Sequence, residues 1–241
     1  MRGVFRTVRL AVIGGILVAG AALPAAVAEG DEPDFKSEFF QYCDSARKDV
    51  LEQAKAVEKK GRAFYWDSYA VRGLAVAYDM TGKQKYLEAC KLWSDHMIEI
   101  QEQMTPPGAY YMQYGRKPGE KEGGWYVADC SSIALGVLAT AVRCQDKAEY
   151  ERYLNSVKAF ADLVAANWVR PSGGVTDGYW PKSDKEWWCS TGIYGSLAFC
   201  LFRETGDERY LKIGLGAIDW LNRQDLRSEE HTSELQSPYV I

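Results

Sequence analysis

The heptapeptide TGKQKYL at residues 81–87 returns as TGDERYL at residues 205–211. Tyr86 and Tyr210 are the tyrosines of these two copies, and Tyr150 lies almost midway between them in the chain. Three copies of one unit therefore fit a period of roughly 60 residues, and self-similarity at a fixed period is typical of proteins that repeat one supersecondary unit.

After each of these three tyrosines, apolar residues follow the spacing of an amphipathic helix. Tyr86 and Tyr150 start the same series, with apolar residues at the fourth, seventh, eleventh and fourteenth positions beyond the tyrosine. Tyr210 keeps the series as far as Leu221, and Gln224 then breaks it. One apolar stripe on a charged helix is typical of a helix that packs a single face on a core. The pattern therefore predicts three outer helices.

A more apolar segment precedes each outer helix. These segments are apolar nearly all round and rich in Gly, Ala and Ser, which is typical of buried helices whose backbones approach closely. They span residues 70–80, 132–142 and 192–202. Gly82 and Gly206 follow two of them, and a glycine at this place often ends a helix because it adopts a positive φ.

An inner helix, a tight turn and an outer helix, repeated, make up a ring of helical hairpins. We therefore expect an all-α fold, an α/α toroid, with one further amphipathic helix over residues 35–60 in front of the first hairpin. No window keeps the period-two alternation of a strand for long, so no sheet is predicted.

The start of the chain differs from this repeat. Residues 1–28 combine three arginines, an apolar run and the small residues Ala26, Val27 and Ala28, which predicts a secretory signal cleaved after Ala28. We therefore expect a secreted or periplasmic protein. The alternative is a retained membrane anchor, but three glycines interrupt the apolar run, whereas a span needs about 20 apolar residues.

The other end also departs from the repeat. Residues 227–237, RSEEHTSELQS, resemble the translation of a widely used sequencing-library adapter. We expect residues 227–241 to be non-native and residues 29–226 to form a partial α/α toroid domain. The alternative is an ordinary polar tail.

The charge balance disfavours two classes of partner. The whole chain carries a net charge of −4, which becomes −5 without residues 1–28 and 227–241. Nucleic acids and anionic membranes require a basic face, so we expect neither partner once the signal is cleaved. The sequence does not indicate an oligomeric state.

The six cysteines show no metal-binding spacing. None of them forms a CxxC pair, so no metal or other cofactor is expected. In an oxidising compartment some of them could pair as disulfides, and the alternative is that most are small core residues. The set is Cys43, Cys90, Cys130, Cys144, Cys189 and Cys200.

Two long connections, residues 104–129 and 168–189, are rich in aromatic residues. Both lead into the start of an inner helix, so we expect them on one rim of the ring. Aromatic faces with polar tips suit sugar rings, and concave aromatic pockets are the usual ligand sites; the alternative is that these side chains only pack the loops onto the rim. The candidate substrate-binding residues are Tyr110, Tyr111, Tyr114, Arg116, Trp125, Tyr126, Trp180, Trp187 and Trp188.

Three aspartates on this rim are the candidate catalytic residues: Asp67, Asp129 and Asp177. Cleavage of a glycosidic bond commonly needs one carboxyl group with a raised pKa and a second that is ionised. The alternatives are that Asp67 and Asp129 only cap helices and that Asp177, which precedes a glycine, only forms a turn.

Histidine chemistry has little support in this sequence. Outside the C-terminal tail the chain has one histidine, His96, which falls on an outer helix. The GxSxG elbow of serine hydrolases is absent from the sequence.

The TGxxxYL turns, the aromatic residues and Asp at the inner-helix mouths, and the long rim loops resemble the six-hairpin glycosidase-like superfamily. The resemblance spans about residues 65–225 and implies a funnel at the ring centre, with Asp67 and Asp129 at its mouth. It also implies about six hairpins, of which this chain offers three. The expected function is that of a secreted carbohydrate-active enzyme, a glycoside hydrolase or a polysaccharide lyase; a lyase would use Tyr114 with Arg116.

Two other functions are alternatives, because one fold serves several chemistries. One is a non-catalytic glycan-binding or scaffold toroid. The other comes from residues 188–192, WCSTG, which resemble the WCxG segment of lanthionine-cyclase-like toroids, where the cysteine binds catalytic zinc. The Cys-His pair that completes that zinc site is missing from this sequence.

Overall fold

The computed structural model describes residues 34–55, 64–111, 126–177 and 184–224. The chain divides into two units, residues 1–35 and residues 36–241, and the helix contacts described here lie within the second. The expected signal peptide and the expected non-native tail lie outside the described residues.

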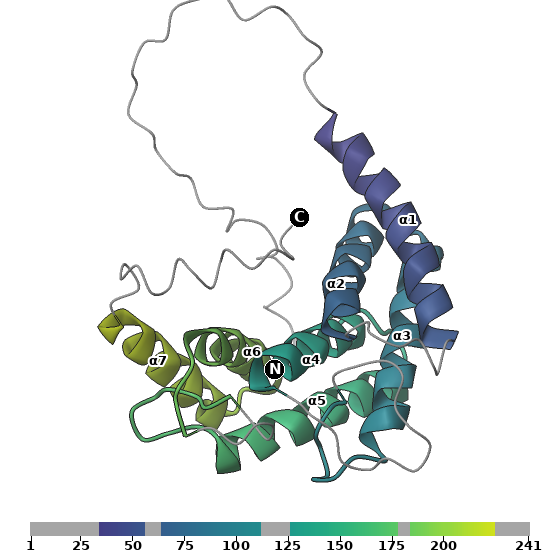
Figure 1. Cartoon of the computed structure of the whole chain (residues 1–241). Coiled ribbons are helices and arrows are strands. Elements are labelled where there is room, and N and C mark those ends of the chain that lie inside the picture. Colours follow the sequence, from purple (N-terminus) through teal and green to yellow (C-terminus); the bar gives the residue numbers. More distant parts are fainter. Residues whose placement is uncertain (1–33, 56–63, 112–125, 178–183, 225–241) are drawn as a thin grey trace, which may run out of the picture. The chain divides into compact units, whose positions relative to one another are not determined.

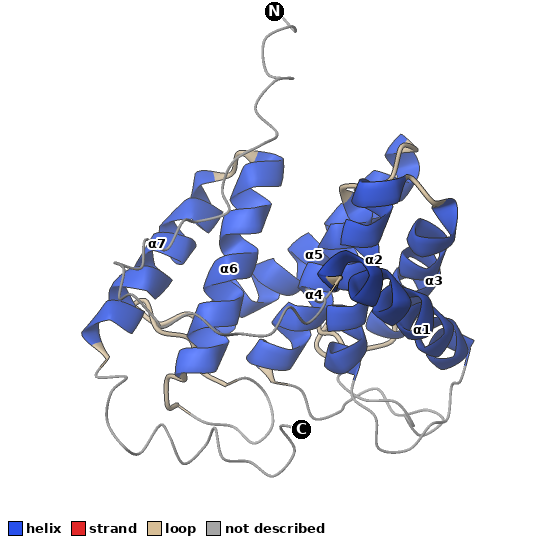
Figure 2. Ribbon diagram, turned by 90° about the horizontal axis from the view of Figure 1, so that it is seen from above, coloured by secondary structure: helices blue, strands red, loops and turns tan. Residues whose placement is uncertain are grey.

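The described residues form seven α-helices, which confirms the all-α expectation (Figure 1, Figure 2). Two isolated bridges, Val169 with Val175 and Thr176 with Glu186, lie in the connection that follows α5. In the described part of the chain, no helix is long and apolar enough to cross a membrane. The helices are α1 (Phe35–Lys55), α2 (Phe64–Thr81), α3 (Gln84–Gln101), α4 (Val127–Ala141), α5 (Lys147–Asn167), α6 (Trp188–Thr205) and α7 (Glu208–Arg223).

The helices pack as consecutive hairpins. The inner helix α4 contacts α2 on one side and α6 on the other, and each inner helix packs against the outer helix that follows it. Figure 2 shows the last of these pairs, α6 beside α7. The outer helices α3 and α5 also contact the next inner helix. The predicted division into inner and outer helices is therefore confirmed.

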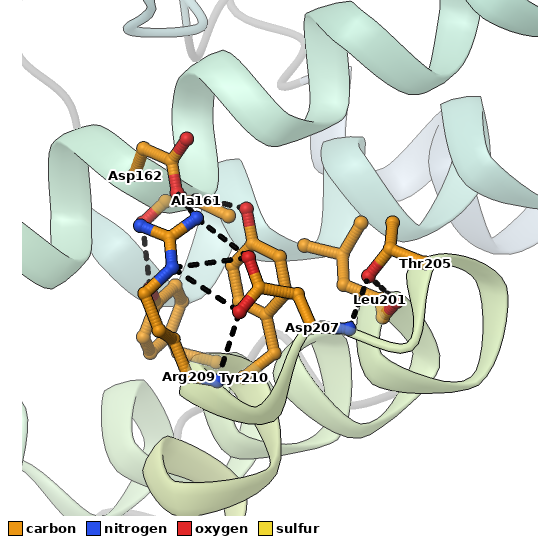
Figure 3. A network of polar contacts seen from close by, with 8 residues as sticks. Ala161, Asp162, Leu201, Thr205, Asp207, Arg209 and Tyr210 are labelled. Carbon is orange, nitrogen blue, oxygen red and sulfur yellow. Dashed lines mark hydrogen bonds and ion pairs between the residues drawn. The ribbon is translucent and has the colours of Figure 1, made fainter.

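The repeated Thr-Gly pair ends two of the inner helices. Gly206 has a φ of 71° and its N–H donates to the carbonyl of Phe202 at 2.8 Å. The Thr205 hydroxyl donates to the carbonyl of Leu201 at 2.7 Å and accepts from the N–H of Asp207 (Figure 3). The first copy makes the same contacts around Gly82, whose φ is 66°. The pair thus satisfies backbone groups that the end of a helix leaves open.

Small residues let the helices approach, as the composition predicts. A Cβ on Gly136 of α4 would lie 2.9 Å from the Trp93 ring of α3, and one on Gly195 of α6 would lie 2.7 Å from Ala217 of α7. Trp93 is fully buried. Side chains at these glycines would push the helices apart.

All six cysteines are free, so no disulfide joins the hairpins. Cys43, Cys90 and Cys130 are fully buried and belong to the core. Burial raises the pKa of the Cys90 thiol to about 12, which keeps it protonated. These three cysteines act as small core residues.

Consecutive outer helices are joined by a contact that the sequence pattern did not predict, here called the Asp–Tyr clasp. In each case an aspartate on one outer helix accepts the hydroxyl of a buried tyrosine on the next, and the basic residue just before that tyrosine pairs with the same aspartate. Figure 3 shows the third clasp, in which the Tyr210 hydroxyl donates to Asp162 at 2.8 Å. The three sets are Asp44 with Lys85 and Tyr86, Asp95 with Arg152 and Tyr153, and Asp162 with Arg209 and Tyr210.

The clasp corrects the register of the middle repeat. Sequence spacing matches Tyr150 with Tyr86 and Tyr210, but Tyr150 is only half-buried and Tyr153 makes the clasp. Tyr153 is 1% exposed, as are the other two clasp tyrosines. The apolar spacing alone is wrong here because it cannot tell which of two tyrosines on one helix face reaches the neighbouring aspartate.

Removal of the Tyr153 hydroxyl tests the contribution of a clasp. Tyr153→Phe removes one of the hydrogen bonds that the partly buried Asp95 accepts, leaving the one from Arg152, and is expected to lower the free energy of unfolding by about 1.5–3 kcal/mol. Tyr150→Phe, on the same helix, is the control and should change it by less than about 0.5 kcal/mol. Urea denaturation followed by circular dichroism measures both; equal effects would contradict the clasp.

Candidate functional site

Asp129 lies in the first turn of α4, and it is not a helix cap. The N-cap of α4 is Tyr126, which makes no side-chain capping bond, so the capping alternative for Asp129 is wrong. The carboxyl group is mostly buried, and burial together with the negative charge of Asp177 raises its pKa to about 6. A carboxyl group with this pKa exchanges its proton near neutral pH.

Asp177 reaches Asp129 from the connection between α5 and α6. Its main-chain carbonyl accepts the N–H of Val127, the first residue of α4, at 2.8 Å. Its carboxylate accepts the Ser190 hydroxyl of α6 at 3.1 Å. Burial raises the pKa of Asp177, and the bond from Ser190 opposes this shift. The two contacts hold Asp177 between the starts of two inner helices.

Tyr65 brings the start of α2 to the same place. It is the second residue of α2, and its pKa is raised by burial and then by the charge of Asp129. The N-terminal ends of α2, α4 and α6 therefore converge, and Tyr65, Asp129, Asp177 and Ser190 form one group, here called the carboxylate site. The positive ends of the helix dipoles at these termini favour negative charge.

The connection after α5 is fixed by side-chain contacts on both neighbouring helices. The N–H of Val175 donates to the Thr191 hydroxyl of α6 at 2.9 Å. The Glu186 carboxylate accepts the Trp220 indole N–H of α7 at 2.7 Å. Trp187 and Val175 share a main-chain hydrogen bond. These hydrogen bonds fix the connection in place, and the connection positions Asp177 in the site.

Asp67 lies three residues beyond Phe64, the first described residue of α2, so it is inside the helix. Its side chain is fully buried. Asp67 therefore differs from the partly exposed Asp129 and Asp177, and a catalytic role for it stays a prediction.

The substrate-binding candidates of the first long connection, together with Trp180 of the second, divide into three groups. Tyr110 is fully buried, its hydroxyl bonds to Ser156 at 2.6 Å, and its ring packs on Phe160, so its expected place on an exposed rim is wrong. Tyr111 and Tyr126 are half-buried against the core. The remaining first-loop candidates and one second-loop candidate lie outside the described residues: Tyr114, Arg116, Trp125 and Trp180.

Trp187 is the N-cap of α6 and Trp188 is its first residue, and both are half-buried. In the described part of the chain, neither buried indole N–H has a hydrogen-bond partner. The Lys185 ammonium covers one face of the Trp187 ring at 4.5 Å from its centroid. Contact of these two rings with a substrate stays a prediction.

The zinc alternative depends on the thiol of Cys189, which lies beside the carboxylate site. Burial and the charge of Asp177 raise its pKa, which disfavours the thiolate that zinc requires. Among the described residues, no three His, Cys, Asp or Glu side chains gather as a metal site. His96 packs edge-on against Phe64, and burial lowers its pKa.

Two members of the carboxylate site, Tyr65 and Ser190, were not candidates from the sequence. A signal for them exists, because each stands within the first three residues of an inner helix, as Asp129 does. Aligning the starts of the inner helices, in addition to the outer-helix tyrosines, would bring them together.

The hydrogen bond from Ser190 should keep Asp177 ionised at lower pH. Ser190→Ala removes a bond that lowers the pKa of Asp177, so that pKa rises and less of the carboxylate is ionised at a given pH. If Asp177 acts as the base, the acid limb of the kcat/KM profile moves up by about one pH unit. Ser196→Ala on the same helix, where the exposed hydroxyl bonds only to Gly192, should leave the profile unchanged. An unshifted limb in Ser190→Ala would exclude this role.

Comparison with known proteins supports the fold. No protein-family model matches this chain, and no curated protein matches it. A solved structure of a protein described as a polysaccharide lyase is similar, with a TM-score of 0.55 and 17% sequence identity. The match covers 77% of this chain and 58% of that one, so this chain spans little more than half the length of that protein. The chain thus has an all-α hairpin fold that resembles part of a polysaccharide lyase.

Proposed function

We propose that this protein is an exported carbohydrate-active enzyme that cleaves glycosidic bonds of a poly- or oligosaccharide at the carboxylate site. The observation that carries the proposal is the unequal pair of carboxyl groups. Burial raises the pKa of both carboxyl groups; that of Asp129, next to the charge of Asp177, reaches about 6, while the hydrogen bond from Ser190 opposes the shift of Asp177. Glycoside hydrolysis needs this division between a protonated and an ionised carboxyl group.

The chemistry assigned to the pair is acid–base hydrolysis. Protonated Asp129 gives its proton to the glycosidic oxygen as the bond from the anomeric carbon to that oxygen breaks. Ionised Asp177 either takes a proton from the attacking water or attacks the anomeric carbon itself, and water then completes the hydrolysis. In both cases one water molecule is consumed for each bond cleaved, and Asp129 regains its proton from water.

Lyase chemistry is the second candidate, because the similar solved structure is described as a polysaccharide lyase. A lyase removes the proton beside a uronic carboxylate and leaves a double bond in the product. Tyr65 is a poor base for this step, since its pKa is raised and its phenol stays protonated. The predicted pair for this reaction, Tyr114 with Arg116, lies outside the described residues.

A glycan panel tests the proposal. The full chain is incubated with neutral and uronic polysaccharides, and new reducing ends and the ultraviolet absorbance of unsaturated products are measured. Hydrolysis gives reducing ends without the absorbance, whereas a lyase gives both. The absence of both signals across the panel would refute an enzymatic role and favour the non-catalytic glycan-binding alternative.

A further inference from the structure

A cavity of about 210 Å³ opens between α1 and α2, apart from the carboxylate site. Buried Ala46 and Val50 of α1 form part of its lining. Ala70 of α2 adds a further apolar contact. The cavity therefore has an apolar base made by both helices.

Two aromatic rings stand at this cavity and are exposed to solvent. Tyr42 of α1 is 54% exposed and Trp66 of α2 is 50% exposed. Leaving large aromatic faces in water contributes little to folding, so two of them on one concavity indicate a binding surface. The Trp66 ring is also held in place, because it makes an edge-to-face contact with Tyr65 at 5.8 Å between centroids.

Polar groups beside the rings restrict the chemistry of a ligand. Ser45 and Asp49 of α1 line the cavity, and they supply a hydroxyl group and a carboxylate. The described residues that line it include no lysine or arginine. The carboxylate accepts hydrogen bonds from sugar hydroxyl groups but repels the carboxylate of a uronic acid.

The cavity and the carboxylate site each include one of two adjacent residues at the start of α2. Trp66 contacts Tyr65, and Tyr65 is close enough to Asp129 for that charge to act on it. A glycan bound across the start of α2 would therefore meet both places.

We propose that the α1–α2 cavity is a separate sugar-binding subsite that takes a neutral sugar residue. The ring stacks on Trp66 and Tyr42, and its hydroxyl groups bond to Asp49 and Ser45. The inference rests on the proposed function only in that the same glycan would occupy both places. It adds a class of sugar, a neutral one, that the carboxylate site does not specify.

Binding to the full chain tests the subsite, with Asp129→Asn as the background so that no glycan is consumed. Isothermal titration calorimetry compares neutral trisaccharides of glucose, mannose and galactose with a trisaccharide of galacturonic acid. At least one neutral trisaccharide should bind more tightly than the uronic one. Trp66→Ala and Asp49→Asn should each weaken its binding by about fivefold to tenfold.

Matched variants serve as controls. Met80→Ala removes an equally exposed apolar side chain from α2, and Glu52→Gln removes an exposed carboxylate from α1; neither residue lines the cavity, and neither variant should change the affinity. If Trp66→Ala is unfolded by circular dichroism, Trp66→Leu and the surface variant Asp49→Asn carry the test.

The outcomes separate the two proposals. Binding that needs Trp66 and Asp49 supports the subsite even if the glycan panel shows no cleavage. No binding of any neutral trisaccharide, equal affinities in all variants, or preference for the uronic trisaccharide would overturn the subsite while leaving cleavage at Asp129 intact.

Discussion

Asp129→Asn is expected to lower kcat on any cleaved glycan by about 10²- to 10⁴-fold, the range that general acid catalysis contributes. Asn keeps the shape of the side chain but has no proton to give to the leaving oxygen. The measurement is the initial rate of reducing-end release. Asp219→Asn on α7 is the control, because that carboxylate is exposed and belongs to an outer helix, and its rate should equal that of the unchanged protein.

The same substitution should stabilise the fold at neutral pH. The pKa of Asp129 rises from the ordinary carboxyl range to about 6 on folding, so between about pH 4 and 6 the folded chain holds more protons than the unfolded chain. Stability is therefore lost as the pH rises through this window, and the full penalty is present above it. The rise in the pKa of Asp129 limits the stability lost on its ionisation to about 3 kcal/mol. The remaining contact of the carboxyl group with solvent reduces this loss to about 1–2 kcal/mol.

Thermal unfolding at pH 4, 5, 6 and 7 measures this penalty. Asp129→Asn should match the unchanged protein near pH 4 and exceed it at pH 7, because Asn has no charge to bury. An active variant, or one that is less stable at pH 7, would remove Asp129 from the proposed role as the acid.

Gly173→Ala is expected to give the largest loss of stability, about 2–5 kcal/mol. Gly173 has a φ of 92°, and a Cβ there would lie 2.3 Å from the main-chain oxygen of Gly216 on α7. The connection would have to move off α7, and Asp177 lies four residues further along it. Activity should therefore fall even at temperatures where the variant stays folded.

Gly206→Ala is the matched control for this substitution. Gly206 also has a positive φ, of 71°, but nothing lies within 4 Å of the position that a Cβ would occupy. Gly206→Ala should therefore lose only the free energy needed to hold an alanine at positive φ, about 1 kcal/mol. This variant should keep full activity. Chemical denaturation and the reducing-end assay compare the two variants; equal losses would show that the contact with Gly216 does not matter.

The fold was predictable because its signals are local in the sequence. Thr205 and Gly206 terminate a helix through bonds within a few residues of each other, so the repeated pair marks the turn without knowledge of anything distant. The apolar series after Tyr86 likewise predicts one helix face from residues that are close together in the sequence. Only its register failed, at Tyr150, because the choice of Tyr153 depends on Asp95 in another helix.

The site was predictable only in part. Asp129 and Asp177 followed from their positions beside aromatic residues, but the coupling between them did not, because it joins the start of α4 to the connection that follows α5. Tyr110 was misplaced for the same reason. The position of Tyr110 in a long connection suggests an exposed side chain. In the structure, the Tyr110 hydroxyl bonds to Ser156 on α5 and the ring packs in the core.

The sequence by itself determined that this chain repeats a helical hairpin at a nearly constant interval, because helix periodicity and glycine turns are set by near neighbours. The tertiary structure decided which side chains meet. Three inner helices begin at one place, so Tyr65, Asp129, Asp177 and Ser190 converge there, and burial combined with one negative charge raises the pKa of Asp129. Burial and proximity are properties of the packed chain, and no local pattern carries them.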